Sequence, residues 1–157
     1  MKAVFSLLTP LASLLLALPA QADRLPLPAD TPPAYRAECG SCHLAYPPAL
    51  LGANDWRQLM GKLDSHFGSD AAVNPEIGQK LTAFLVANAG NPNRTGAAGN
   101  PPRISQTTHF LKEHRKIPAR FWSDPRVRSA ANCEACHTNA ANGRFSEHDI
   151  AIAELRR

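Results

Sequence analysis

Several common patterns are missing from this sequence of 157 residues. It has no long alternation of apolar and polar residues and no heptad pattern, which argues against a β-sheet fold and against a coiled coil. Beyond residue 22, no stretch is apolar enough to span a membrane. The net charge is only +4, and the basic side chains neither cluster nor interleave with aromatic ones. The composition therefore does not favour a nucleic-acid-binding protein.

Cysteine is also scarce, and all four cysteines lie in two short clusters. Each cluster has the spacing C-x-x-C-H, first in Cys39, Cys42 and His43 and again in Cys133, Cys136 and His137. A disulfide within such a pair would close too small a loop to stabilise the fold much. A thioredoxin-like dithiol needs a βαβ pattern, which is absent, and a four-cysteine zinc site would leave both histidines unexplained.

The histidine directly after each second cysteine indicates covalently bound c-type haem. The two thiols add to the vinyl groups of the haem, and the adjacent imidazole binds the iron as its proximal ligand. The sequence therefore predicts two haem c groups, attached through the four cysteines, with His43 and His137 on the two irons.

Residues 1–22 have the pattern of a secretory signal peptide. Lys2 precedes an apolar run rich in Leu and Ala, and the segment ends in the A-x-A pattern of Ala20 to Ala22. Two prolines interrupt the run, which is shorter than the ~20 residues that usually span a bilayer. We therefore expect cleavage after Ala22 and export to a bacterial periplasm, where c-type haem can be attached.

Apolar residues at helical spacing predict a mostly α protein, with helices over residues 33–43, 54–67, 75–88 and 107–116 and a further helix at the second cluster. Residues 91–103 are rich in Gly, Asn and Pro and predict a linker. This linker would separate two small haem domains, at 23–90 and at 104–157. The first has the order of a class I cytochrome c, namely haem helix, ligand segment and closing helix. In the tail, Ile150 and Ile152 alternate as a short strand or a helical end would.

The second axial ligand of each iron decides whether the haem transfers electrons or binds a small molecule. Past the signal peptide there is one methionine, Met60, and four histidines lie outside the clusters, namely His66, His109, His114 and His148. This supply favours two histidines on each iron.

For the first iron, the preferred second ligand is His66, which lies at helical spacing from Leu63, and the alternative is Met60. For the second iron, His114 shares a helical face with Phe110 and is preferred over His109 and then His148. Crossed ligation, in which a histidine of one domain binds the haem of the other, is a further alternative. Tyr46 is expected either at a porphyrin edge, on the side facing the second haem, or in ordinary packing.

The flanking segments are similar to those of the small soluble dihaem cytochromes c of proteobacteria. The resemblance runs over about residues 35–152 and is carried by "ECGSCHLAYPPALL", "WRQLMGKLDSHFGSDA", "FLVANAG", "RISQTTHFLKEHRKIP" and "ANCEACHTNAANGRFSEHDI". It implies a class I cytochrome c-like first domain and a second domain with little regular structure. It also implies that His43 and His66 bind the first iron, and His137 and His114 the second.

The predicted function is electron transfer through two bis-histidine haems, without enzymatic activity. The resemblance implies an oxygen-binding monohaem cytochrome c as the redox partner and a membrane quinol-linked b-type cytochrome as the donor. The alternatives are a small haem peroxidase or gas-binding haem protein with one open iron, and a small dihaem subunit of a periplasmic reductase.

Overall fold

The computed structural model describes residues 24–156, so the predicted signal peptide lies outside the described residues. Over this range the only β-structure is a set of isolated bridges, and the chain is mostly helical and irregular, as expected. Its α-helices are α1 (Pro33–Cys39), α2 (Ala53–Met60), α3 (Pro75–Ala87), α4 (Pro92–Thr95) and α5 (Thr108–Glu113). Short 3₁₀ helices lie at Pro48–Leu50, Leu63–Ser65, Ile104–Gln106, Ala119–Ser123, Cys133–Ala135, Ala140–Asn142, Glu147–Asp149 and Ala153–Leu155. None of the described helices is long and apolar enough to cross a bilayer.

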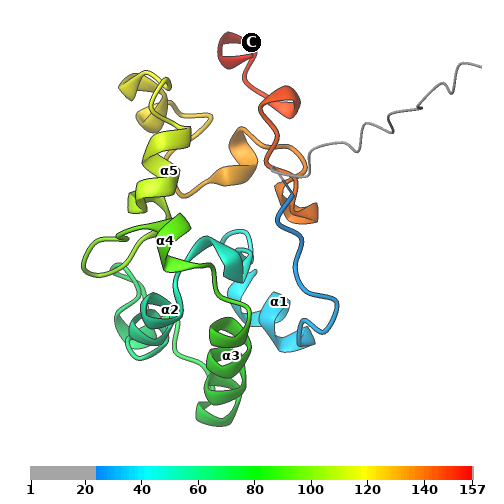
Figure 1. The fold of residues 1–157 in the computed structure, drawn as a ribbon, viewed down its shortest axis with the longest axis vertical. Coiled ribbons are helices and arrows are strands. Elements are labelled where there is room, and N and C mark those ends of the chain that lie inside the picture. Colours follow the sequence, from blue (N-terminus) through cyan, green and yellow to red (C-terminus); the bar gives the residue numbers. More distant parts are fainter. Residues whose placement is uncertain (1–23, 157) are drawn as a thin grey trace, which may run out of the picture.

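Two apolar cores organise the chain, one in each half of the molecule as drawn in Figure 1. Helices α1, α2 and α3 surround the first core, in the lower half, and α5 and the C-terminal segments form the upper half. The buried residues of the first core are Tyr35, Leu51, Trp56, Leu81, Phe84, Leu85 and Ala98. Those of the second core are Phe121, Val127 and Ile152. The second core is therefore the smaller of the two.

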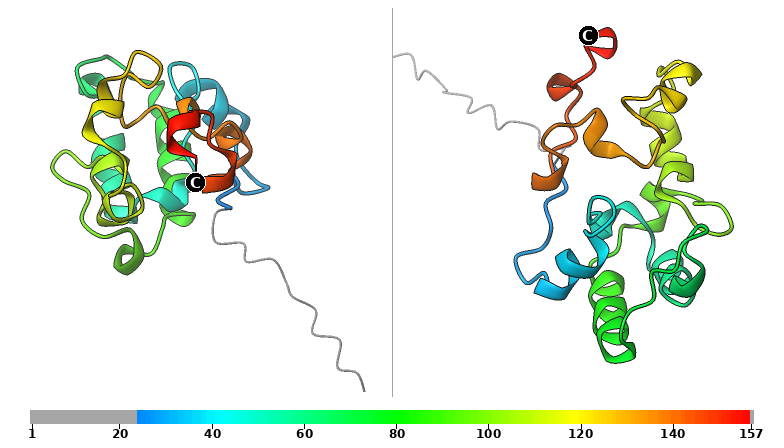
Figure 2. Two further views of the ribbon diagram at one scale, coloured as in Figure 1. Left: turned by 90° about the horizontal axis from the view of Figure 1, so that it is seen from above. Right: turned by 180° about the vertical axis from the view of Figure 1, so that it is seen from behind.

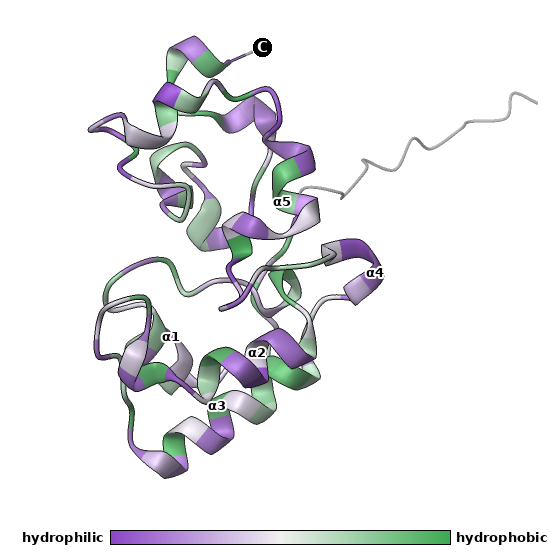
Figure 3. Ribbon diagram, turned by 90° about the vertical axis from the view of Figure 1, so that its left-hand side faces the viewer, coloured by the Kyte–Doolittle hydropathy of each residue, from purple (hydrophilic) through white to green (hydrophobic). Residues whose placement is uncertain are grey.

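Helix α3 is the longest helix of the described chain, and its ends follow simple rules. It begins with a proline at its first position, Pro75, and the side chain of Asn74 accepts a hydrogen bond from the backbone N–H of Glu76. Its apolar face packs on α2 and on the ring of Tyr35, and Figure 3 shows that both helices carry hydrophobic and hydrophilic sides. The helix predicted over 75–88 is present with its end shifted by one residue.

The segment expected as a linker folds onto the first core. It contains α4, its Thr95 is buried, and Ala98 belongs to the first core. The domain boundaries placed around residues 91–103 stay a prediction, but this stretch packs against the N-terminal region.

The first described residues reach across to the C-terminal region (Figures 1 and 2). The backbone N–H of Leu25 donates to the carbonyl of Gly143 at 2.7 Å, and Arg24 and Arg144 form an antiparallel bridge. Gly143 has a φ of +70°, and a Cβ there would approach Pro26 to 2.4 Å. Only glycine fits at position 143, because a side chain there would collide with residues 25 and 26. We call residues 24–26 the N-terminal strap.

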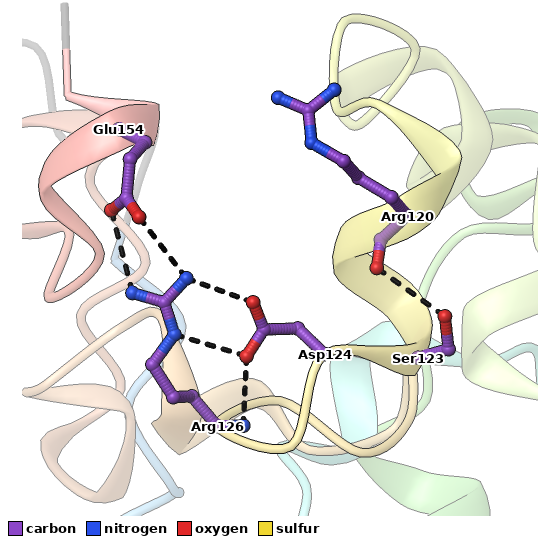
Figure 4. Close-up of polar contacts among 5 residues, drawn as sticks. All are labelled: Arg120, Ser123, Asp124, Arg126 and Glu154. Carbon is purple, nitrogen blue, oxygen red and sulfur yellow. Dashed lines mark hydrogen bonds and ion pairs between the residues drawn. The ribbon is translucent and has the colours of Figure 1, made fainter.

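An arginine ties the C-terminal tail to the loop before the second cluster (Figure 4). Arg126 donates to both carboxylate oxygens of Asp124, at 2.8 and 3.0 Å, and to Glu154 at 3.1 Å. This contact lowers the pKa of Asp124 to about 2, because the charged carboxylate accepts the hydrogen bonds from Arg126. The tail alternation noted in the sequence corresponds to a bridge between Ile150 and His137, flanked by 3₁₀ helices.

The helix predicted over 54–67 is wrong in its second half. Helix α2 ends at Met60, because Gly61 closes it with a hydrogen bond from its N–H to the carbonyl of Arg57 at 3.1 Å. The chain then makes one 3₁₀ turn and a tight turn, in which Phe67 has a φ of +53°. The second cluster also lies on a 3₁₀ turn, Cys133–Ala135, rather than on a regular helix.

Candidate functional site

The first cluster sits where α1 ends. Cys39 is the last residue of the helix and packs against the first core, whereas Cys42 and His43 follow in a turn and are exposed. At Gly40, a Cβ would come within 2.4 Å of the carbonyl oxygen of Arg36. The residue inside the C-x-x-C pair that lets the chain turn is thus fixed as glycine.

A cavity of about 560 Å³ opens beside this turn, within the size range of small-molecule and cofactor sites. Its lining includes both cysteines and His43 on one side and the apolar side chains of the first core on the other. His66 and Met60 also line it, as does Tyr46. An apolar cavity next to two free thiols and an exposed imidazole fits a large planar apolar cofactor attached through those thiols.

The imidazoles of His43 and His66 face each other with ring centres 6.2 Å apart. A metal–imidazole bond of about 2.0 Å on each side places the ring centres of two opposite ligands roughly 6 Å apart. The spacing of this pair therefore fits one iron between the rings. The Nδ1 of His43 donates a hydrogen bond to the carbonyl of Leu44 at 2.8 Å, which leaves Nε2 to bind the metal.

His66 is held less firmly than its sequence context predicts. It follows the 3₁₀ turn Leu63–Ser65, and its backbone forms two hydrogen bonds with that of Ser69, at 2.8 and 3.1 Å. Its Nδ1 is buried and has no hydrogen-bond partner in the described chain. Burial lowers the pKa of His66, and the nearby His43 and Arg103 lower it further, so the neutral form that binds metal is favoured.

The second cluster has the same kind of histidine pair. The ring of His114 lies 6.1 Å from that of His137, a spacing that again fits one iron. His114 is the residue that ends α5, and its Nδ1 donates to the carbonyl of Phe110 at 2.9 Å. Its ring stacks on Phe110 at 4.0 Å and lies near Trp122. Burial lowers the pKa of His114 as well.

The thiols themselves argue against a redox dithiol. Burial raises the pKa of Cys39 and of Cys133 to about 11, and it raises the pKa of Cys136. Reactive C-x-x-C pairs do the reverse, because they need a lowered pKa to form the thiolate. All four thiols are free, and within residues 24–156 no three metal-binding side chains gather into a metal site. Disulfide and zinc alternatives therefore find no support in the described chain.

Tyr46 connects the two regions. Its ring stacks on His43 at 4.7 Å, and its hydroxyl donates to the carbonyl of Ala131, two residues before Cys133. Cys133 itself lines the cavity of the first cluster. Tyr46 thus lies on the side facing the second cluster, and burial raises the pKa of its hydroxyl. The two clusters are neighbours in space.

The remaining predicted residues are placed as follows. Met60 is partly buried against the first core and lines the cavity. His109 and His148 are exposed, and the ring beside His137 is that of His114. Sequence reasoning missed Phe145, whose ring lies 5.7 Å from that of His137. No local pattern marks Phe145, because the chain folds back on itself to bring it there.

Comparisons with known proteins show the family of this chain. A family model described as "Dihaem cytochrome c" matches residues 35–145. A solved structure of a dihaem cytochrome type c from Shewanella baltica OS155 is 36% identical, with a TM-score of 0.66, over 74% of this chain and 88% of that one. Two structures from Rhodobacter sphaeroides also match. One, of purified DHC, is 40% identical with a TM-score of 0.64 over 73% of this chain and 97% of that one. The other, of a dihaem cytochrome c, is 37% identical with a TM-score of 0.66 over 74% and 98%. No curated protein matches the chain.

Proposed function

The chain belongs to the dihaem cytochrome c family and carries two c-type haems, and from this premise we propose that it is a periplasmic electron carrier whose irons are each bound by two histidines. When bound, the haems supply reversible one-electron chemistry at iron. Haem-based electron transfer is the function common to the family. The compartment, the ligand pairs and the absence of an enzymatic activity are part of the proposal.

The observation that supports it best is that two histidine rings lie opposite each other at each of the two clusters. His43 with His66 and His114 with His137 have ring centres 6.2 and 6.1 Å apart. With both axial positions taken, an iron has no open site for substrate, and its role is electron transfer. Thioether bonds from the four cysteines would hold the two haems covalently.

The protein's own side chains would act on orientation and on solvent. The Nδ1 atoms of His43 and His114 each form a hydrogen bond with a backbone carbonyl, which leaves Nε2 of each ring to bind the metal. The buried rings of Trp56 and Phe84 belong to the core beside the first site and limit water there. The Tyr46 ring stacks on His43, and its hydroxyl donates a hydrogen bond to Ala131, just before Cys133. Tyr46 therefore contacts both sites.

Spectra of the oxidised protein without added ligand test the ligand pairs. Both irons should be low-spin, and the two should give different electron-paramagnetic signals. The ring planes of the first pair differ by 32° and those of the second by 89°. Nearly perpendicular axial imidazoles give a more anisotropic low-spin signal than nearly parallel ones, so the more anisotropic signal belongs to the second iron.

Single substitutions then assign the ligands. His66→Ala should leave one iron high-spin and remove the less anisotropic signal, and His114→Ala should remove the other. His109→Ala and His148→Ala are the matched controls, because both side chains are exposed. A high-spin iron in the unaltered protein would contradict the proposed ligation and favour the open-iron alternative. Two low-spin irons in His66→Ala would show instead that another residue is the second ligand of the first iron.

The proposal extends to location and partners. Residues 1–22 support export, and cell fractionation with mass measurement of the mature chain tests cleavage after Ala22.

The sequence resemblance supports an oxygen-binding monohaem cytochrome c as acceptor and a quinol-linked b-type cytochrome as donor. Rapid mixing of the reduced protein with such an acceptor should show electron transfer in both haem signals, and no transfer would remove that partner from the proposal.

A further inference from the structure

One charged side chain at the first haem site contacts an aromatic ring rather than an acid. The guanidinium of Arg103 lies 3.9 Å from the centre of the Phe67 ring, and both residues line the cavity. The ion pairs of the described chain involve Lys80, Arg126 and Arg144, and Arg103 is in none of them.

Phe67 needs an outside contact to stay where it is. Its φ of +53° lies in the left-handed region, which is unfavourable for a residue with a Cβ. Its side chain is 38% exposed, so core packing does not fix it. Arg103 covers the ring, and attraction between a cation and an aromatic face stabilises this arrangement.

Phe67 is in turn the neighbour of the metal-facing histidine. The rings of Phe67 and His66 have centres 4.8 Å apart. Among the described residues, none forms a hydrogen bond with Nδ1 of His66, so ring packing must orient the imidazole. The contact from Arg103 to Phe67 therefore reaches His66 in two steps.

The backbone that carries Arg103 is well anchored. Its N–H donates to the carbonyl of Ala98 at 2.7 Å, and Ala98 lies in the first core. The preceding residue, Pro102, is fully buried. The anchored backbone at Arg103 thus lets its side chain hold Phe67 in the exposed turn.

We propose that Arg103 is the positioning residue of the first haem site, holding His66 toward His43 through its contact with Phe67. The inference rests on the proposed function, because it takes His66 as an axial ligand. The consequence is directional: weakening the contact lets His66 swing away from His43, while the His114–His137 pair is unaffected.

The competing role for an arginine at this cavity is a bidentate pair with a haem propionate. The two roles predict different couplings. If Arg103 acts through Phe67, removing either residue has the same effect, and removing both adds little. If Arg103 pairs with a propionate, the two substitutions have independent effects that multiply.

The experiment follows carbon monoxide binding to the reduced, haem-loaded protein, since carbon monoxide binds only where an axial ligand has left. The variants are Arg103→Gln, Arg103→Lys, Phe67→Leu and the double variant Arg103→Gln/Phe67→Leu. Arg120→Gln is the matched control, because Arg120 also lies over a ring, that of Phe121 at 4.9 Å, but in the C-terminal region. His66→Ala gives the reference spectrum of carbon monoxide on the first haem.

We expect Arg103→Gln to bind carbon monoxide at the first haem roughly three- to thirtyfold faster than the unaltered protein, the range that the loss of a cation–π contact allows. Arg103→Lys should restore most of the slow rate. Phe67→Leu should match Arg103→Gln, and the double variant should be no faster than either. Arg120→Gln should leave the rate unchanged.

An unchanged rate in Arg103→Gln would overturn the inference, as would multiplying effects in the double variant. A faster rate that appears at the second haem would overturn it as well. Failure of the proposed ligation gives a different result, because His66→Ala would then leave both irons low-spin before any carbon monoxide is added.

Discussion

The two haem sites have nearly the same distance between their histidine rings, 6.2 and 6.1 Å, but the histidines are held by different contacts. His114 is held by a hydrogen bond from its Nδ1 to the carbonyl of Phe110 and by stacking on the Phe110 ring. His66 lies on an exposed turn, and its Nδ1 has no hydrogen-bond partner within residues 24–156. The cores differ in the opposite direction, since the first has seven buried residues and the second three. The N-terminal region thus has the larger core and the less firmly held proposed ligand, His66, whereas the C-terminal region has the smaller core and the more firmly held proposed ligand, His114.

This contrast shows that ligand rigidity and regional stability are set by different features. A core stabilises a region through buried apolar area, whereas a ligand is fixed by its own hydrogen bonds and neighbours. A region with few buried residues needs another source of stability, and a covalently bound haem supplies one.

The largest effect should come from removing the haem anchors. With Cys133 and Cys136 both changed to Ser, the C-terminal region should lose its protection against proteolysis, because the part of its core that the structure describes has three buried residues. The matching change of Cys39 and Cys42 should leave partial protection in the N-terminal region. Limited proteolysis with mass spectrometry measures both, and equal protection of the two regions in the two variants would break the comparison.

A core substitution should come next in size. Leu85 is fully buried in the first core, so Leu85→Ala should lower the free energy of unfolding by about 2–5 kcal/mol. Leu111→Ala, at a side chain that is 57% exposed, is the control and should change it by about 0.5 kcal/mol or less. Denaturant unfolding monitored by circular dichroism gives both values, and a similar loss in the two variants would mean that the first core does not stabilise its region.

The contact between the regions should have a smaller effect. Tyr46→Phe removes the hydrogen bond to the carbonyl of Ala131 and should lower the free energy of unfolding by about 1 kcal/mol. Tyr35→Phe removes a bond within the N-terminal region, from its hydroxyl to the carbonyl of Tyr46. Hydrogen exchange should therefore show faster opening around Ala131 in Tyr46→Phe only. The same pattern in Tyr35→Phe would show that Tyr46 is not the connection.

The smallest effect should come from the exposed contact of Arg126, and it should depend on pH. The pKa of Asp124 is lowered from 3.8 to about 2 by the hydrogen bonds from Arg126, so the contact stabilises the fold at neutral pH. This stabilisation is lost as the pH falls through about 2, when the folded protein binds the proton. Asp124→Asn should be slightly less stable at pH 7 and equal to the unaltered protein near pH 2, measured by thermal unfolding. A difference that persists in acid would assign the effect to packing.

Much of the architecture follows from local sequence. The two C-x-x-C-H clusters predict the two haems, and the proline and asparagine before residues 76–87 predict the start of α3. Helix α5 lies inside the range expected for it. These features depend on residues within a few positions of one another, which is where sequence patterns carry information.

The arrangement around His66 could not be derived in the same way. Its apolar spacing from Leu63 indicated a continuous helix, but Gly61 ends α2 and the left-handed Phe67 turns the chain. The contact between Arg103 and Phe67 joins segments that are distant in sequence, and so does that between Tyr46 and Ala131. Such pairs depend on the tertiary fold and leave no periodic signal.

The N-terminal strap has a consequence for how the chain is completed. Synthesis runs from the N-terminus, so Leu25 is made early, yet its hydrogen-bond partner Gly143 is made near the end. The loop that this contact closes spans most of the described chain, and closing it costs more conformational entropy than forming a local contact does. Both cysteine clusters are made before it can form. A chain that has been made only as far as residue 142 therefore cannot form the hydrogen bond from Leu25.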